Sequence, residues 1–331
     1  MGRNDARSVV AFCSFRVFFI ICFIASVGLS DSLYAQVGDD IPKYNISLRY
    51  PITILHKYKY EETTEVLRTF SDSSRRSYER NVQYFFTHNN NQMRDDGIIV
   101  LDVSIDSLIY SFKEKKSEIF FNSQGEDLSA FNFPDFKTVS VPLSKSFKLY
   151  ISPYGEPIKI EGERLTEYRN YLKKGTGQID SLELFYWEDG ISDERLISII
   201  FPNKISLPSS VIAKDSTWKS LYKMQADYKN LYDTCDVKFL GFVNGNYNIS
   251  SKANKYIFNK NSSYFPLLSK LANIDSVKGT SVYNLDITPR GTIKYATSDY
   301  DIIIYGTHIR DFFYDIIKSK SSWELLGQYK F

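Results

Sequence analysis

The segment FKLYISPYG at residues 147–155 returns later in the chain as YNLDITPRG at residues 283–291. Both copies follow the pattern aromatic-x-Leu-x-Ile-(Ser/Thr)-Pro-x-Gly, and an Ile-Lys pair follows each of them. The copies lie roughly one domain length apart along the chain. The repeat therefore predicts a duplicated module.

Each copy has the pattern of a strand that enters a turn. In the first copy Phe147, Leu149 and Ile151 alternate with more polar residues, which is the period of a half-buried strand. The Ser/Thr-Pro-x-Gly sequence that follows suits a type I turn closed by a left-handed glycine. Each copy is therefore predicted to be a β-hairpin, and the turn chemistry already accounts for its Pro and Gly without a binding role.

The composition extends the strand prediction over most of the chain. The 25 Tyr and 24 Phe residues favour strands, because aromatic side chains fill the half-buried surface of a sheet. The segment 100–112 can be laid over 237–249, which would match Tyr110 with Tyr247 and extend the repeat. Asn244 and Gly245 predict a tight turn. The strands expected outside the repeated hairpins are 45–56, 57–70, 77–88, 98–104, 107–113, 218–228, 233–242, 247–251 and 300–305.

Helical periodicity is confined to three segments. Residues 162–174 carry an apolar stripe and end before Gly175, and residues 192–200 begin at a capping Ser192. Near the end, residues 308–318 have apolar side chains at i, i+3, i+4, i+7 and i+8, which predicts an amphipathic helix. Its apolar stripe is expected to dock on the second module, with docking on a membrane or a partner as the alternative. The members of that stripe are Ile309, Phe312, Phe313, Ile316 and Ile317.

The predicted fold is mainly β (β-rich α+β), with two duplicated antiparallel β modules, each a curved sheet in a sandwich or half-barrel. A short helical connector joins the modules, and a C-terminal amphipathic helix follows them. The expected division is a signal peptide at 1–35, a first module at 36–162, the connector at 163–205, a second module at 206–307, and a helix with its tail at 308–331.

The N-terminus has the layout of a signal peptide. Basic residues precede an uncharged apolar stretch at 17–29, which is too short to span a bilayer comfortably, and small and polar residues follow it. Cleavage is expected after Ala35. The chain is then exported to the periplasm or the exterior, with an uncleaved, membrane-associated form as the alternative.

Charge and cysteine content exclude some partners. The chain has 41 basic and 39 acidic residues, so it has no excess charge of one sign to attract nucleic acid. After cleavage Cys235 is the last remaining cysteine, so neither an internal disulfide nor a disulfide-linked partner is expected. Cys235 itself is expected to be a small, partly buried strand residue.

Catalytic and metal signatures are weak. His56, His88 and His308 share no local spacing suited to a metal or a nucleophile-base pair, and His56 and His88 are expected to be exposed or hydrogen-bonded at strand ends. The sequence thus predicts no catalytic residue, no metal ligand and no cofactor, and the ligand-binding residues remain unknown.

The acidic and aromatic residues also favour a structural interpretation. The adjacent carboxylates Glu61 and Glu62 are expected to face opposite ways on a strand and so not to form one acid-base site. Among the aromatic residues, Trp187 and Trp218 are expected to pack where the modules meet.

A group of residues at the expected module junction carries a family resemblance. The chain resembles an uncharacterised family of exported, β-rich bacterial proteins that contain a domain of unknown function and a Pro-x-Val-x-Gly-Asp-x-Trp type junction. The resemblance covers residues 45–306 and implies an exported two-module β architecture without a known activity. This chain departs from the pattern at Lys214, where a glycine is expected. The residues that carry the resemblance are Phe201, Pro202, Leu207, Pro208, Val211, Asp215 and Trp218.

Two classes of function remain open. The first is a non-enzymatic, envelope-associated protein that binds or scaffolds an apolar, sugar or protein ligand. The second is a hydrolase that acts on envelope or extracellular polymers with a site assembled from distant residues. The sequence favours the first, because no signature of a nucleophile marks the chain.

Overall fold

The structure is a computed structural model that describes residues 41–125, 129–143, 145–175, 180–227, 229–258, 263–265, 268–308 and 311–330. Residues 43–331 form one compact unit, which contains all of the elements below. The expected signal peptide and its cleavage site lie outside the described residues.

Antiparallel strands make up most of this unit, so the prediction of a mainly β protein is confirmed. The strands of the first half are β1 (Lys43–Tyr44), β2 (Ile54–Phe70), β3 (Arg75–Met93), β4 (Ile99–Glu114), β5 (Ser117–Asn122), β6 (Ser146–Ile151) and β7 (Pro157–Glu161). Those of the second half are β8 (Ile212–Ala213), β9 (Thr217–Ala226), β10 (Lys229–Val243), β11 (Asn246–Ala253), β12 (Ile257–Phe258), β13 (Ser263–Phe265), β14 (Leu268–Ile287), β15 (Ile293–His308) and β16 (Asp311–Lys330).

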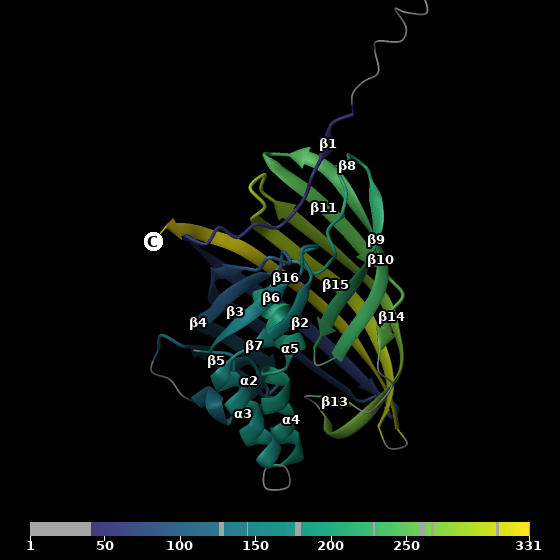
Figure 1. Cartoon of the computed structure of the whole chain (residues 1–331). Coiled ribbons are helices and arrows are strands. Elements are labelled where there is room, and N and C mark those ends of the chain that lie inside the picture. The colour runs from purple at the N-terminus through teal and green to yellow at the C-terminus, as the bar shows by residue number, and fades with distance from the viewer. Residues whose placement is uncertain are drawn as a thin grey trace, which may run out of the picture. The chain divides into compact units, whose positions relative to one another are not determined.

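One large sheet contains strands from both halves of the chain. Within the described residues it has 14 strands, and its main path runs β12-β10-β11-β14-β15-β16-β2-β3-β4-β6-β7 without closing on itself. The last strand, β16, pairs antiparallel with β2 over most of the length of both, and Figure 1 shows the yellow C-terminal strand beside the dark early strands. The two expected modules therefore share one continuous sheet.

Both repeated segments are hairpins of the predicted kind. In the first hairpin (β6–β7) Gly155 has φ +77°, and in the second (β14–β15) Gly291 has φ +82°. The N–H of Ser152 donates to the Glu156 carbonyl at 2.8 Å, and the N–H of Thr288 donates to the Thr292 carbonyl at 2.9 Å. The prediction of a turn closed by a left-handed glycine is confirmed in both copies.

The surroundings of the two hairpins also match. The first hairpin pairs with β4, where Ile99 faces Ile151, and the second pairs with β11, where Tyr247 faces Ile287. One strand further out, β3 and β10 each carry a bulge, between Asn90 and Gln92 and between Phe239 and Gly241. In the first half of the chain, the residue that corresponds to Tyr247 is therefore Ile99, and not Tyr110 as expected.

The prediction of a C-terminal helix is wrong, because residues 311–330 form the strand β16. Its buried positions alternate, from Phe313 through Asp315, Ile317 and Ser319 to Trp323. Polar Asp and Ser residues on the buried face hide the strand period from a hydrophobicity pattern, and the apolar residues at helical spacing include Phe312, which is 67% exposed.

The prediction of a strand over 45–56 is wrong for most of its length, since β2 begins at Ile54. Residues 45–53 bury alternate side chains like a strand but form no ladder, and a turn at Pro51 interrupts the chain before β2. We call this segment the first strap. Its Arg49 N–H donates to the carbonyl of Gly291 at 2.8 Å, so it crosses the turn of the second hairpin.

A second strap, residues 201–208, crosses the turn of the first hairpin in the same way. Its Leu207 N–H donates to the Tyr154 carbonyl at 2.9 Å, and the Asn203 side-chain amide donates to the Gly155 carbonyl at 2.7 Å. Both straps contain the sequence Ile-Ser-Leu, at 46–48 and 205–207. Each half of the chain is thus tied by its leading segment to the hairpin of the other half.

Helices gather beside the strands of the first half (Figure 1). Helix α3 ends before Gly175, and α5 is capped by Ser192, whose hydroxyl accepts from the Arg195 N–H at 3.1 Å, as predicted. A short 3-10 turn, η1 (Ser129–Asn132), and the helices α2 and α4 were not expected. The helices are α2 (Pro134–Ser140), α3 (Glu163–Lys174), α4 (Ser181–Gly190) and α5 (Asp193–Ile200).

Candidate functional site

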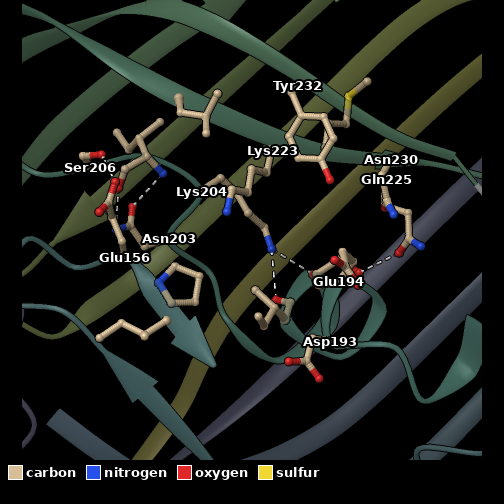
Figure 2. A pocket seen from close by; sticks show the side chains of 17 residues that line it. Glu156, Asp193, Glu194, Asn203, Lys204, Ser206, Lys223, Gln225, Asn230 and Tyr232 are labelled. Carbon is tan, nitrogen blue, oxygen red and sulfur yellow. Dashed lines mark hydrogen bonds between the residues drawn. The ribbon is translucent and has the colours of Figure 1, made fainter. Parts of the chain in front are cut away.

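A pocket of about 450 Å³ opens where the second strap passes between the first hairpin and the second half of the chain. Figure 2 shows its lining, to which five segments contribute. These are the end of the first hairpin turn with the start of β7, the helix α5, the second strap, β9, and β10. The pocket is therefore built from both halves of the sheet and from the helix that connects them.

Part of the pocket lining is apolar. Ile158 of β7 and Leu221 of β9 are 50% and 46% exposed, and Ile205 of the second strap is buried. Half-exposed aliphatic side chains at the mouth of a cavity are typical of a surface that loses water when a ligand binds.

Among the charged groups of the pocket, Lys204 of the second strap has the pKa that lies furthest from its ordinary value. Its Nζ donates to the carbonyls of Ile197 and Ser198, at 3.2 and 3.0 Å, and lies 4.7 Å from the ring centroid of Trp323. Burial lowers the pKa of Lys204 to about 7. The two carbonyls belong to the last turn of α5, where a cation favours the helix dipole, so one role of Lys204 is to cap this helix.

The acidic residues of the pocket differ in how they are held. Glu156 accepts a hydrogen bond from the Ser206 hydroxyl, and Asp193 pairs with Arg169 at 2.6 Å. Glu194 is exposed beside Tyr232, and burial together with this carboxylate raises the pKa of the Tyr232 hydroxyl.

Glu194 and the exposed Lys223 of β9 form no ion pair with other described residues. Lys223 is the register partner of Tyr232 on the neighbouring strand, and Figure 2 labels both, together with Asn230, among the lining side chains. A carboxylate, an ammonium, an amide and a phenol thus line the same pocket as the apolar side chains. Such a set can hydrogen-bond to hydroxyl groups of a small ligand and orient it.

The sequence singled out neither this pocket nor Trp323. Trp323 packs on Tyr60 at 4.9 Å between ring centroids, and its indole N–H donates to the Ile199 carbonyl at 2.7 Å. Trp218 donates to the Ser206 carbonyl at 2.8 Å and so lies against the second strap, whereas Trp187 lies beside Tyr168 within the helices. Trp323 lies beyond the expected helix 308–318, in the predicted tail, and the sequence indicated no contact for it.

The residues considered as nucleophiles and acid-base groups do not converge. Cys235 is 2% exposed, burial raises the pKa of its thiol, and its Sγ contacts the Ser220 carbonyl. Glu61 and Glu62 face opposite ways, as expected, since Glu61 bonds to Gln83 and Glu62 to the buried Arg80. His56 and His88 were expected to be either exposed or hydrogen-bonded. Both are 0% exposed, so the first of these two expectations is wrong.

A buried charge network underlies the helices. Arg80 of β3 pairs with Asp135 of α2 at 3.1 Å, with Asp227 at the β9–β10 turn at 3.3 Å, and with Glu62 of β2 at 3.2 Å. The hydroxyl of Tyr110 also donates to Asp135. The network holds α2 and the β9–β10 turn against the sheet, and its members come from segments too distant in sequence for a motif.

Comparisons with known proteins give no family. No family model and no curated protein matches the chain. Solved structures that are similar include OpdQ of Pseudomonas aeruginosa, with 8% identity, 82% of this chain and 99% of that chain covered, and a TM-score of 0.20. OccK7 of the same organism has 8% identity, coverages of 83% and 100%, and a TM-score of 0.22. The translocator domain of autotransporter NalP from Neisseria meningitidis has 7% identity, coverages of 92% and 97%, and a TM-score of 0.17.

TM-scores of this size carry no argument about the fold or function of this chain. Among the helices of the described residues, none has the length and apolar character needed to cross a membrane.

Proposed function

We propose that the chain is an exported, envelope-associated protein that binds a small hydroxyl-rich ligand of the sugar class in the pocket between its two halves, without catalysing a reaction. The observation that carries this proposal is the combination in one pocket of half-exposed apolar side chains, Ile158 and Leu221, with the uncommitted polar groups of Glu194 and Lys223. Sugars present hydroxyls to such polar groups and C–H groups to such apolar side chains.

Binding is favoured over hydrolysis because the acidic groups are already engaged. Asp193 is held by Arg169, and Glu156 is held by Ser206. A hydrolase needs two carboxylates that converge on one bond, or a nucleophile beside a base, and Cys235 is buried on a backbone carbonyl.

Duplication and export belong to the same proposal. The matched hairpins, the matched bulges of β3 and β10 and the reciprocal straps support an origin by duplication. The pocket then arises at a place where the two copies differ, because only the first hairpin has the connector and second strap beside it. The leader at 1–35 supports export, and the junction residues support membership of the uncharacterised exported family that the sequence resembles.

Isothermal titration with a panel of monosaccharides and disaccharides tests the binding site. We expect at least one sugar to bind, and Glu194→Gln and Lys223→Met each to weaken it about tenfold, since a hydrogen bond to a charged group contributes about 1.5–3 kcal/mol. Lys252→Met, which removes an exposed lysine from β11 outside the pocket, is the matched control and leaves binding unchanged. Sugar binding that is insensitive to both pocket variants, or no binding by any sugar, contradicts the proposal.

A further inference from the structure

Exposed apolar side chains gather at the C-terminal end of β10. Leu240, Phe242 and Val243 in the last turns of this strand are 41%, 46% and 46% exposed, and Val211, which precedes β8, is 57% exposed. Single exposed apolar residues are common on protein surfaces, but a group of them marks a place of interaction. We call these four residues the apolar tip.

Contacts between β1, β8 and β10 bring the apolar tip together. Ile212 of β8 is the register partner of Tyr44 of β1, and the ring of Tyr44 stacks on that of Phe242 with 6.3 Å between centroids. The N–H of Asp215, just beyond β8, donates to the Phe239 carbonyl at 2.8 Å. Figure 1 shows β1 and β8 together at the upper end of the view. The apolar tip therefore occupies one end of the sheet.

Basic side chains surround the apolar tip. Lys43 is the register partner of Ala213, and the Lys214 side chain lies 3.3 Å from the position that a Cβ on Gly241 would take. The turn of the second hairpin lies at the same end, because Ile287 pairs with Tyr247 and Tyr247 with Phe242, and this turn adds a pair of arginines. All four basic side chains are exposed, and none of them forms an ion pair with another described residue. They are Lys43, Lys214, Arg49 and Arg290.

Two acidic side chains near these positions are already engaged. Asp215 is paired with Lys238 at 2.7 Å, and Asp286 accepts a hydrogen bond from the Asn248 amide at 2.5 Å. In the part of this end that the structure describes, the free charge is therefore mainly positive, which favours an anionic partner.

A bilayer fits this combination better than a second copy of the chain does. Apolar side chains insert at the boundary between headgroups and acyl chains, while nearby lysines and arginines attract anionic headgroups. A twofold dimer through the same surface would place the four basic residues against their own copies, which repel. The chain also enters the compact unit at Lys43, so the segment that carries the apolar stretch 17–29 is joined to this unit among the basic residues.

We propose that the apolar tip and its four basic residues dock the protein on an anionic lipid bilayer. This goes beyond the sugar-binding proposal and gives the association with the envelope a physical basis. The pocket is lined by Asn230 and Tyr232 near the start of β10, and the strand from Tyr232 to Phe242 spans about 30 Å. Docking therefore leaves the pocket free, and patch variants should leave sugar binding unchanged, so the two proposals succeed or fail separately.

Co-sedimentation of the purified protein with vesicles tests the docking. Vesicles of phosphatidylcholine alone are compared with vesicles that also contain about 30% phosphatidylglycerol, at low and at high salt. We expect binding to the anionic vesicles that high salt weakens. If the protein stays in the supernatant with both kinds of vesicle, the proposal is overturned.

Apolar variants locate the contact. Phe242→Ser should weaken binding to the anionic vesicles about tenfold, because a half-exposed aromatic ring no longer enters the bilayer. The double variant Leu240→Ser, Val243→Ser should have a similar effect, and it leaves the ring stack of Phe242 in place, so it tests the apolar tip even if Phe242→Ser loosens β1. Phe120→Ser is the matched control, because Phe120 of β5 is 60% exposed and lies outside the tip, and it should bind like the wild type.

Basic variants test the attraction to anionic headgroups. Lys214→Gln should weaken binding to the anionic vesicles about fivefold and leave binding to phosphatidylcholine unchanged. Lys115→Gln, which removes an exposed lysine between β4 and β5, is the matched control. Binding that none of the tip and lysine variants changes would assign the lipid contact to another part of the chain. A wild-type dimer that Phe242→Ser converts to monomers would assign the tip to a second copy, and either outcome overturns the proposal.

Discussion

Arg68 of β2 and Asp315 of β16 form a two-point ion pair in the interior of the sheet. The Arg68 Nε and Nη2 donate to the two carboxylate oxygens of Asp315, each at 2.6 Å, and both side chains are at most 1% exposed. The residues are register partners in the pairing of β2 with β16. The pair therefore lies where the first long strand meets the last one.

Removing one partner of this pair is expected to destabilise the protein strongly. Asp315→Asn leaves the buried guanidinium without a compensating charge and should lower the free energy of unfolding by about 3–5 kcal/mol in denaturant titration. The double variant Arg68→Met, Asp315→Leu removes both charges and should lie within about 1 kcal/mol of the wild type, because it also removes their desolvation cost. Equal losses in the single and double variants would show that packing, and not the unpaired charge, sets the effect.

The same pair explains why the last strand was not predicted. A strand is recognised when apolar residues alternate, but the buried face of β16 carries Asp315, Ser319 and Ser321 among its apolar residues. These polar residues are acceptable in the core because partners from distant strands satisfy them, and Thr64 bonds to Ser319 across the β2–β16 pairing. A sequence shows its own period but not such partners.

Local signals, in contrast, were sufficient for turns and caps. Asn244 and Gly245 have φ of 51° and 80°, which is the mirror-image turn that the Asn-Gly pair predicts. Ser192 caps α5 as expected. The pocket and the straps escaped prediction because each one depends on segments brought together by the fold, such as Asn203 with Gly155.

Because the first strap lies close to the second hairpin, substitution by alanine is expected to destabilise the protein more at Gly291 than at Gly245. Gly291 and Gly245 both have positive φ, but a Cβ on Gly291 would lie 2.6 Å from the Ser47 carbonyl oxygen, whereas one on Gly245 would meet nothing within 4 Å. Gly245→Ala should cost about 1 kcal/mol from its backbone conformation alone. Gly291→Ala should cost at least about 2 kcal/mol more, measured by denaturant unfolding, because the strap must move. Similar losses at both sites would mean that the strap is not held against the turn.

The buried network around Asp227 predicts sensitivity to acid. Burial alone would raise the pKa of Asp227, but Lys229 and Arg80 outweigh it and hold the pKa below the usual value. The unfolded chain therefore takes up this proton more readily than the folded chain, and the stability that Asp227 contributes above about pH 4 is lost as the pH falls through the folded-state pKa.

Asp227→Asn should remove this dependence. We expect the variant to be about 2–4 kcal/mol less stable than the wild type at pH 7, and the difference to shrink toward pH 2 in urea titrations. Asp236→Asn is the matched control, because the Asp236 side chain is 73% exposed in its pair with Lys219 and its loss should change stability by less than about 1 kcal/mol. A difference that stays constant with pH would exclude the ionised carboxylate as the stabilising group.

Lys204 is expected to react as an amine at unusually low pH. Burial lowers its pKa to about 7, while the unfolded chain keeps the ordinary value near 10.5, so the folded protein releases this proton first. The free energy of unfolding should accordingly rise with pH between about 7 and 10.5 relative to that of Lys204→Met. Competitive acetylation read by mass spectrometry should show the Lys204 amine becoming reactive near pH 7 in the folded chain and only near pH 10 in urea.

The exposed Lys223 on the rim of the same pocket serves as the reference for access of the reagent. If Lys204 acetylates at the same pH with and without urea, the carbonyls of Ile197 and Ser198 and the ring of Trp323 hold the ammonium charged against the effect of burial. The residue would then act in the pocket as a fixed cation. A reactive Lys204 would instead offer the pocket a neutral amine that can hydrogen-bond a ligand hydroxyl in either direction, which is the form that a sugar site can use best.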